Sequence, residues 1–240
     1  SLIRSTGGQT AGCTDNSIYL PILCRIPQNP VLHLRPTVAG MHLSPEFGVT
    51  ARVIEEDGFE ISDRVEMLLS SDTPEGVAKS VGLGTIGFAQ VFGRSCPDVL
   101  LVLGDRFEMF AAATAALPFN IPIAHLHGGE STEGLIDEAI RHSITKMAHI
   151  HFVSTEFYGK RIVRMGENPW RIQVCGAPAL DNLESFEPVA VDELMASLDL
   201  DLDDRPVLIT YHPVTLEYQQ TTYQVEELLL ALAEVKAPQI

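Results

Sequence analysis

Acidic side chains follow short apolar runs of the sequence, or a pair of glycines, at two places where chemistry could occur. Asp105 comes directly after the apolar run 99–104, and Glu130 follows the His-Gly-Gly sequence at 127–129. Because glycine lets the backbone approach a ligand closely, a carboxylate beside two glycines can point into an opening. A positioned carboxylate can take a proton from a substrate or return one. Asp105 alone is somewhat more often the cap of a following helix, so that alternative stands beside the catalytic one.

Further charged residues lie four positions apart in the helical segment that follows. Asp137 and Arg141 share one face of that segment, as do Glu138 and His142. Taken alone, each pair is more often a surface ion pair that stabilises a helix by roughly a few tenths of a kcal/mol. With the two acids above nearby, the alternative is a cluster of carboxylates flanked by basic side chains. Its members would be Asp105, Glu130 and Asp137 together with Arg106, Arg141 and His142.

The segments that position these residues alternate between apolar runs and helical patterns. Continuous apolar runs are typical of strands that are buried on both faces, and apolar residues at helical spacing follow each run. This order predicts an α/β fold, with a parallel sheet, right-handed crossovers and helices on both faces. Ligands of such sheets bind beyond the carboxyl ends of the strands, where the candidate residues lie. The expected strands are 99–104, 121–126, 149–153 and 171–176, and the expected helices between them are 107–117, 135–148 and 155–165.

The composition changes after Gly176, which divides the chain into two α/β units. The first unit covers residues 1–180, and an acidic connection over 181–205 follows it. The second unit begins at 206 and reaches the last residue, 240. One strand and one helix cannot bury a core by themselves, so we expect this second unit to be incomplete in this chain. Its expected elements are a strand at 206–211 and a helix at 223–236, with a short helix at 191–198 inside the connection.

Charge and hydropathy exclude several classes of partner. The 240 residues include 16 Lys and Arg against 32 Asp and Glu, which gives a formal net charge of −16. Nucleic acids and anionic membrane surfaces require a basic face, so neither is an expected partner. The longest near-apolar stretch, 109–119, is shorter than the roughly 18 residues that a membrane span needs. No signal peptide is recognisable, and we expect a cytoplasmic protein.

The four cysteines give no sign of a zinc site or of a disulfide framework. They are far apart in the sequence, and no two of them form a Cys-x-x-Cys pair. We therefore expect reduced and mostly buried thiols at Cys13, Cys24, Cys96 and Cys175.

Two other motifs resemble ligand sites but are better explained by packing. The Gly-x-Gly-x-x-Gly sequence at 82–87 would need a strand before it, whereas Thr-Pro-Glu at 73–75 indicates the start of a helix that runs through it. His125 and His149, each two residues before another histidine, resemble metal-binding pairs. Both lie inside apolar runs, so we interpret them as core histidines and expect no bound metal.

Several motifs together resemble one known family. They are Ala-Gly-Met-His-Leu-Ser-Pro-Glu-Phe-Gly at 39–48, Gly-Asp-Arg-Phe-Glu at 104–108, His-Gly-Gly-Glu at 127–130, Ile-Asp-Glu-Ala-Ile-Arg-His-Ser at 136–143 and Phe-Val-Ser-Thr-Glu at 152–156. The sequence that carries them is similar to the hydrolysing UDP-N-acetylglucosamine 2-epimerases. The similarity runs from about residue 17 to the end of the chain, whereas the segment before it shares only Thr6-Gly7 with the family's glycine turn.

The resemblance implies an architecture of two Rossmann-like domains, as in glycosyltransferases of the B type. The domain over 1–180 would be the first, and the nucleotide-binding domain that starts at 206 would be the second. The active site would lie in the cleft between them and would need neither a metal nor a nicotinamide cofactor. We expect a homo-oligomer at full length and, because the second domain is cut short, poor turnover by these 240 residues alone.

The resemblance also implies the chemistry. A base removes the proton at C2 of the sugar, UDP leaves C1, and water adds to the resulting glycal with inverted configuration at C2. The product from UDP-N-acetylglucosamine is N-acetylmannosamine, a precursor in sialic acid synthesis. The residues that match the family's catalytic groups are the acids Asp105, Glu130 and Asp137 and, near the leaving phosphate, His212. Those that would hold the sugar and phosphates are His42, Arg106, Arg141 and His142.

The sequence leaves several alternatives open. Relatives that act on UDP-N,N′-diacetylbacillosamine, in legionaminic acid synthesis, share the same motifs, so the sugar is not decided. The acid that takes the C2 proton is also undecided. A sugar-nucleotide-binding module without turnover and a metal-dependent hydrolase are the alternatives from other functional classes.

Overall fold

The computed structural model describes residues 6–10, 13–45, 50–69, 73–132, 136–184, 187–198, 207, 209–211 and 219–235. The chain divides into two compact units. The first comprises Ser1–Thr132 and Asp137–Glu184, and the second comprises Glu133–Ile136 and Ser185–Ile240.

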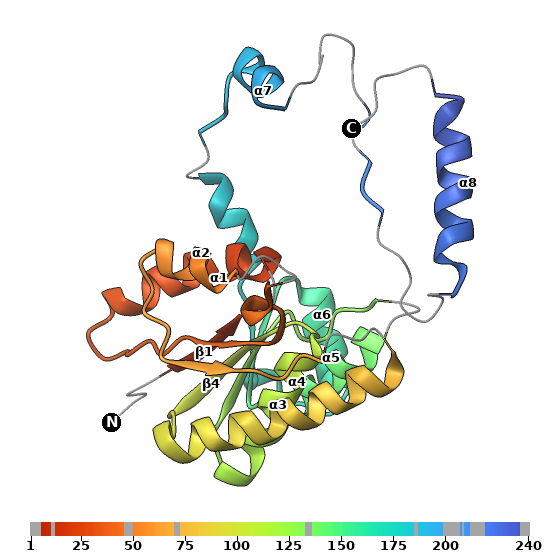
Figure 1. The fold of residues 1–240 in the computed structure, drawn as a ribbon. Helices are drawn as coiled ribbons and strands as arrows, with labels where there is room; N and C mark the ends of the chain where they lie inside the picture. Colours follow the sequence, from red (N-terminus) through yellow and green to blue (C-terminus); the bar gives the residue numbers. More distant parts are fainter. Residues whose placement is uncertain are drawn as a thin grey trace. The chain divides into compact units, whose positions relative to one another are not determined.

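A single parallel sheet forms the centre of the first unit (Figure 1). Its strands lie in the order β3-β2-β1-β4-β5-β6-β7, and each pair of neighbours is parallel. The order of the strands reverses between β1 and β4, which is the position where sheets of this kind bind their ligands. The strand bounds are β1 Thr6–Thr10, β2 Thr37–Ala39, β3 Asp63–Val65, β4 Val99–Leu103, β5 Ile123–Leu126, β6 Ile150–Val153 and β7 Ile172–Val174.

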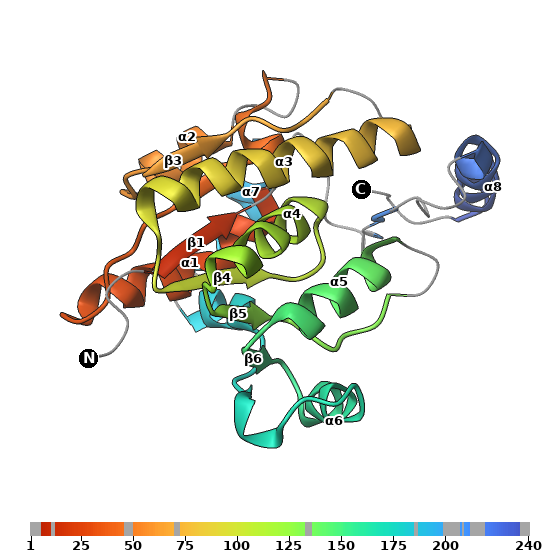
Figure 2. The same cartoon turned by 90° about the horizontal axis from the view of Figure 1, so that it is seen from below.

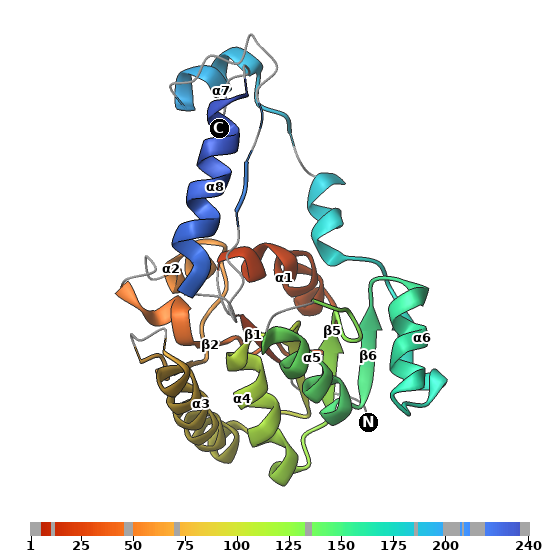
Figure 3. The same ribbon diagram turned by 90° about the vertical axis from the view of Figure 1, so that its right-hand side faces the viewer.

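Helices cover both faces of the sheet, because the buried side chains of the strands alternate between the two faces. Leu100 and Val102 of β4 pack in the core cluster of α3, α4 and α5, which lie side by side along one face in Figures 2 and 3. Leu101 and Leu103 pack with α1 on the other face. The helix bounds are α1 Cys13–Arg25, α2 Ala51–Glu56, α3 Pro74–Ser95, α4 Phe107–Ala116, α5 Ile136–Met147 and α6 Glu156–Arg164.

Short 3-10 turns connect these elements at several points. They are η1 Ile26–Gln28, η2 Gly40–Leu43, η4 Leu117–Phe119, η5 Pro169–Arg171 and η6 Pro178–Glu184.

The expected α/β fold with a parallel sheet is confirmed. β4 to β7 and α4 to α6 fall at the expected places, with ends that differ by a few residues. Thr6–Thr10, which the family motifs do not cover, form β1 between β2 and β4. No helix in the described part of the chain is both long and apolar enough to cross a membrane.

The second unit contains α7, Val191–Leu198, and α8, Thr221–Ala233, close to the expected helices. The expected strand at 206–211 is wrong for the residues that are described, since Val207 forms an isolated bridge and 209–211 are not in a strand. A strand needs several successive pairs with a neighbour, and of the described residues 207 and 209–211 only Val207 is paired. No described residue of α8 is buried.

The Gly-x-Gly-x-x-Gly sequence lies inside α3, as expected. Thr73 caps the helix by accepting a hydrogen bond from Gly76 N at 3.1 Å. A Cβ atom at Gly84 would lie 2.5 Å from Met67 Cε and 3.0 Å from Ala111 Cβ. A Cβ atom at Gly87 would lie 2.6 Å from Val65 Cγ1. These glycines therefore let α3 pack closely against β3 and α4.

We predict opposite effects of alanine at two glycines of this motif. Gly87→Ala should lower the free energy of unfolding by about 1–3 kcal/mol, because the stiff Val65 side chain cannot move away from the new methyl group. Gly82→Ala should raise it by about 0.5–1 kcal/mol, because alanine favours a helix and no described atom lies within 4 Å of the new Cβ. Urea denaturation measures both values. Equal changes in the two variants would contradict the packing role.

The cysteines differ from the expectation in one respect. Cys24, Cys96 and Cys175 are free thiols, but all three are exposed. Cys24 lies next to the buried Leu23 on the outer side of α1, Cys96 ends α3 in a left-handed conformation, and Cys175 follows the edge strand β7. The spacing between cysteines in the sequence does not show which of their side chains face solvent.

The two candidate core histidines have different environments. His125 is fully buried in β5, where its Nε2 lies 2.7 Å from Gly104 O and its Nδ1 lies 3.3 Å from Thr145 Oγ1. His149 is exposed, which corrects the expectation of a core residue, because it precedes β6 and its Nδ1 accepts a hydrogen bond from Ile123 N at 3.2 Å. His125 thus joins the end of β4 to α5.

We predict that His125 makes the protein less stable in acid. Burial lowers the pKa of His125 from its usual 6.5 to about 3. Between these two values the unfolded chain binds a proton that the folded chain does not bind, so the free energy of unfolding falls as the pH decreases. One such group contributes a slope of up to roughly 1.4 kcal/mol per pH unit.

Urea denaturation at several pH values between neutrality and pH 4 tests this assignment. His125→Gln should give a shallower dependence of stability on pH than the wild type, while the exposed control His33→Gln should keep the original slope. Equal slopes in all three proteins would contradict it.

Candidate active site

The candidate residues of the first unit lie at the carboxyl ends of the strands. η2 follows β2 and carries His42, and the turn after β4 carries Asp105 and Arg106. The loop after β5 carries Glu130. Asp137, Arg141 and His142 come from α5, which returns from that loop. The sheet therefore brings residues from four separate segments to one edge.

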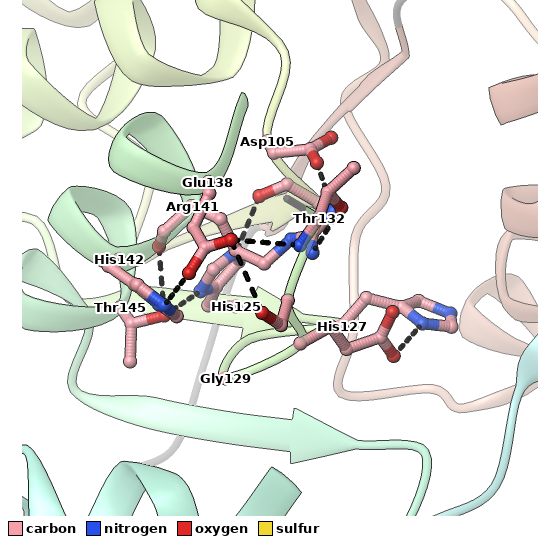
Figure 4. Close-up of polar contacts among 12 residues, drawn as sticks. Asp105, His125, His127, Gly129, Thr132, Glu138, Arg141, His142 and Thr145 are labelled. Atoms are coloured by element: carbon pink, nitrogen blue, oxygen red, sulfur yellow. Dashed lines mark hydrogen bonds and ion pairs between the residues drawn. The ribbon is translucent and has the colours of Figure 1, made fainter. Parts of the chain in front are cut away.

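Arg141 is the central contact of this edge. It is only 7% exposed, and its Nη2 donates a hydrogen bond to the carboxylate of Asp105, while its Nη1 donates to Thr132 Oγ1 at 3.1 Å (Figure 4). Asp105 does not cap α4, because Arg106 occupies the N-cap position of that helix. The capping alternative for Asp105 is therefore wrong, and Arg141 pairs with an acid from another segment.

The environment gives Asp137 and Glu130 different proton affinities. Burial raises the pKa of Asp137, and the neighbouring Asp105 carboxylate raises it further against the charges of Arg106 and Arg141. Burial also disfavours the charged form of Glu130, but hydrogen bonds with His127 and Ser154 and the charge of Arg141 together lower its pKa. At neutral pH Glu130 is an anion, whereas Asp137 takes a proton more readily than an ordinary aspartate.

Arg106 connects this edge to the end of β2. Its Nη2 lies 3.3 Å from Met41 Sδ, and its Nε lies 3.6 Å from the fully buried Glu108 carboxylate. His42 is fully buried, and its Nδ1 lies 2.5 Å from Thr50 Oγ1. Burial and the nearby Arg106 lower the pKa of His42 to about 4, so this side chain is neutral at physiological pH. A role for His42 as a cation towards phosphate is not supported by this environment.

The second helical pair forms as expected on α5. His142 Nε2 lies 3.5 Å from Glu138 Oε1. The other oxygen of Glu138 accepts hydrogen bonds from Ser131 Oγ at 3.2 Å and from Thr132 N at 3.1 Å. Glu138 therefore holds the loop that follows β5 against α5, with His142 beside it.

Three residues at this edge stand in motifs of the sequence analysis but received no role there. Glu108 is the acid buried beneath Arg106, and His127 and Ser154 both contact Glu130. Glu108 had a recognisable signal, since it is the one charged residue in the apolar segment 107–116. His212 lies outside the described residues. The described part of the chain holds no group of three or more His, Cys, Asp or Glu side chains that could bind a metal ion.

The chain is similar to known proteins over most of its length. It is 40% identical over 215 residues to the GDP/UDP-N,N′-diacetylbacillosamine 2-epimerase (hydrolyzing) of Campylobacter jejuni, which covers 89% of this chain and 56% of that protein. It is 37% identical over 230 residues to the UDP-N,N′-diacetylbacillosamine 2-epimerase (hydrolyzing) of Legionella pneumophila, which covers 96% of this chain and 61% of that protein. The chain therefore spans little more than half the length of these relatives.

A solved structure shows the same fold. The UDP-GlcNAc 2-epimerase from Neisseria meningitidis bound to UDP-GlcNAc aligns with a TM-score of 0.79 at 17% identity, over 98% of this chain and 64% of that one. The sequence pattern of the family described as UDP-N-acetylglucosamine 2-epimerase matches residues 25–240. Since this match covers far more than half of the chain, the protein belongs to the UDP-N-acetylglucosamine 2-epimerase family.

Proposed function

We propose that this protein is a hydrolysing 2-epimerase of a UDP-sugar. The observation that carries the proposal is that three acids from separate segments share the electrostatic field of one buried cation, Arg141. Removal of a weakly acidic C–H proton needs a positioned base, and return of a proton to the opposite side of the carbon needs a second, protonated group. The edge of the sheet contains groups suited to each task.

The reaction would proceed by elimination and then addition. A base takes the C2 proton, the C2–H electron pair forms the C1=C2 double bond, and the C1–O pair leaves with UDP. Water then supplies the oxygen that bonds to C1, and a proton adds to C2 from the opposite face. Asp137 suits the role of proton donor because burial and the Asp105 carboxylate raise its pKa and so favour its protonated form. Glu130 is ionised and is held by two hydrogen bonds. Its negative charge therefore suits the part of the site where a base takes the C2 proton.

The cations of the site would hold the charged parts of the substrate. Arg106 and Arg141 can stabilise the diphosphate as negative charge develops on the leaving oxygen. His142 and the neutral His42 would contact the sugar or phosphate. His212 would donate a proton or hydrogen bond to the leaving phosphate from the second domain.

UDP-N,N′-diacetylbacillosamine is the substrate that we propose. Relatives with 40% and 37% identity are named for this sugar nucleotide. UDP-N-acetylglucosamine is the second candidate, because a structure with the same fold binds it. The released 2-epimer would serve the synthesis of a sialic- or legionaminic-type sugar acid. The two-domain organisation, a cytoplasmic location and a homo-oligomeric state belong to the same proposal.

We predict that the protein at its full natural length releases UDP from UDP-N,N′-diacetylbacillosamine without added metal. In heavy water the released sugar should carry deuterium at C2, because the proton removed there exchanges with solvent before a proton returns. Mass spectrometry of the sugar and an assay for UDP measure the two products.

Parallel reactions with UDP-N-acetylglucosamine decide between the two sugars. A higher kcat/KM for that substrate would reverse our order of preference. UDP release without deuterium at C2 would indicate simple hydrolysis and contradict the elimination, and binding without UDP release would favour a non-catalytic module.

We predict that Arg141→Met lowers kcat by roughly two to three orders of magnitude, as for loss of a preorganised electrostatic contact. The variant leaves Asp105 without its counterion and removes a charge that acts on Glu130 and Asp137. Arg164→Met, on the exposed end of α6, is the matched control and should keep the original kcat. Similar kcat values for the two variants would show that Arg141 does not organise the site.

A further inference from the structure

His127, which follows β5, has a backbone conformation that histidine rarely adopts. Its φ is +59°, in the left-handed region, although it is not a glycine. A side chain in this region costs about 1–2 kcal/mol, whereas glycine adopts it without strain. Residues held in such conformations occur often at functional sites, where the strained side chain has a task.

The ring of His127 is fixed by an ionised partner. Its Nδ1 lies 2.7 Å from Glu130 Oε1, and Ser154 Oγ donates a hydrogen bond to the same oxygen at 2.7 Å. A carboxylate can only accept hydrogen bonds, so the proton of the neutral ring must be on Nδ1. The hydrogen-bond network therefore assigns a lone pair to Nε2.

Nε2 of His127 is shielded from solvent and has no hydrogen-bond partner among the described residues. A buried polar atom without a hydrogen-bond partner destabilises the folded protein unless a ligand or a reacting group supplies that partner. His127 follows the carboxyl end of β5, and the charge of Arg141 acts on its partner Glu130. The geometry matches that of a base whose orientation is set by a carboxylate behind it.

We propose that His127 is the catalytic base that takes the C2 proton of the sugar, and that Glu130 and Ser154 are its positioning residues. The inference rests on the proposed 2-epimerase function and assigns the base that the sequence left undecided. The Nε2 lone pair forms the new N–H bond, the C2–H pair becomes the C1=C2 bond, and the C1–O pair leaves with UDP. The Glu130 carboxylate stabilises the imidazolium that results. Asp137 supplies the proton that returns to C2.

His127→Gly tests the base directly, because glycine fits the left-handed backbone and leaves a space that imidazole can enter. In the protein at its full natural length, UDP release should fall by roughly 10²- to 10⁴-fold, the range for loss of a general base. Added imidazole should restore a large part of that activity. The exposed control His33→Gln should release UDP at the wild-type rate and should not respond to imidazole.

Nitrogen-15 NMR of the imidazole ring tests the positioning residues without any substrate. The wild-type ring should carry its proton on Nδ1. In Glu130→Gln the amide can donate instead of accept, so the ring should shift towards the tautomer protonated on Nε2 and UDP release should fall. Ser154→Ala should keep the Nδ1–H tautomer and lose less activity than Glu130→Gln.

The outcomes separate this assignment from the proposed function. UDP release that survives His127→Gly, a loss that imidazole does not restore, or a wild-type ring protonated on Nε2 would each overturn the role of His127 while the 2-epimerase function stands. A wild type that releases no UDP from either sugar nucleotide would overturn the function, and the role of His127 with it.

Discussion

The ion pair between Arg141 and Asp105 joins α5 to the end of β4 across 36 positions of the sequence. Their side chains are 9% and 20% exposed, so neither charge is well solvated. Loss of either partner would leave the other charge without compensation in a site of low solvent access, which is strongly unfavourable. The pair therefore fixes the register of α5 over the sheet. Because Asp137 lies one turn before Arg141, the same contact also sets the position of the second acid.

The charge of Arg141 acts on both Asp137 and Glu130, but the pKa values of these two acids shift in opposite directions. Burial and the Asp105 carboxylate both disfavour the charged form of Asp137, and its pKa is raised. Glu130 is also partly buried, but two hydrogen bonds favour its charged form and lower its pKa. Environments that separate the proton affinities of two carboxyl groups let Glu130 stay ionised behind His127 while Asp137 favours its protonated form at the same pH. An elimination that is followed by addition with inversion requires such a difference.

The sequence predicted the strands and helices that position this site better than the contacts between its side chains. Apolar runs such as 99–104 and 121–126 indicated buried parallel strands, and the carboxyl ends of those strands located the charged residues. The pairing of Arg141 with Asp105 was not readable, because partners 36 positions apart are set by tertiary packing rather than by spacing. For the same reason Ser154 could not be assigned to Glu130, and the exposure of His149 depends on where β6 begins.

Contacts with α6 hold the loop that carries His127 and Glu130. Gly129 has a φ of +75°, and a Cβ atom there would lie 2.8 Å from Tyr158 O, so only glycine lets the loop approach α6 this closely. Arg161 Nη1 of the same helix donates a hydrogen bond to Gly129 O at 2.8 Å. These contacts secure the backbone between His127 and Glu130. The stability that these contacts with α6 give the loop can offset the strain at His127. The base is thereby held in one orientation.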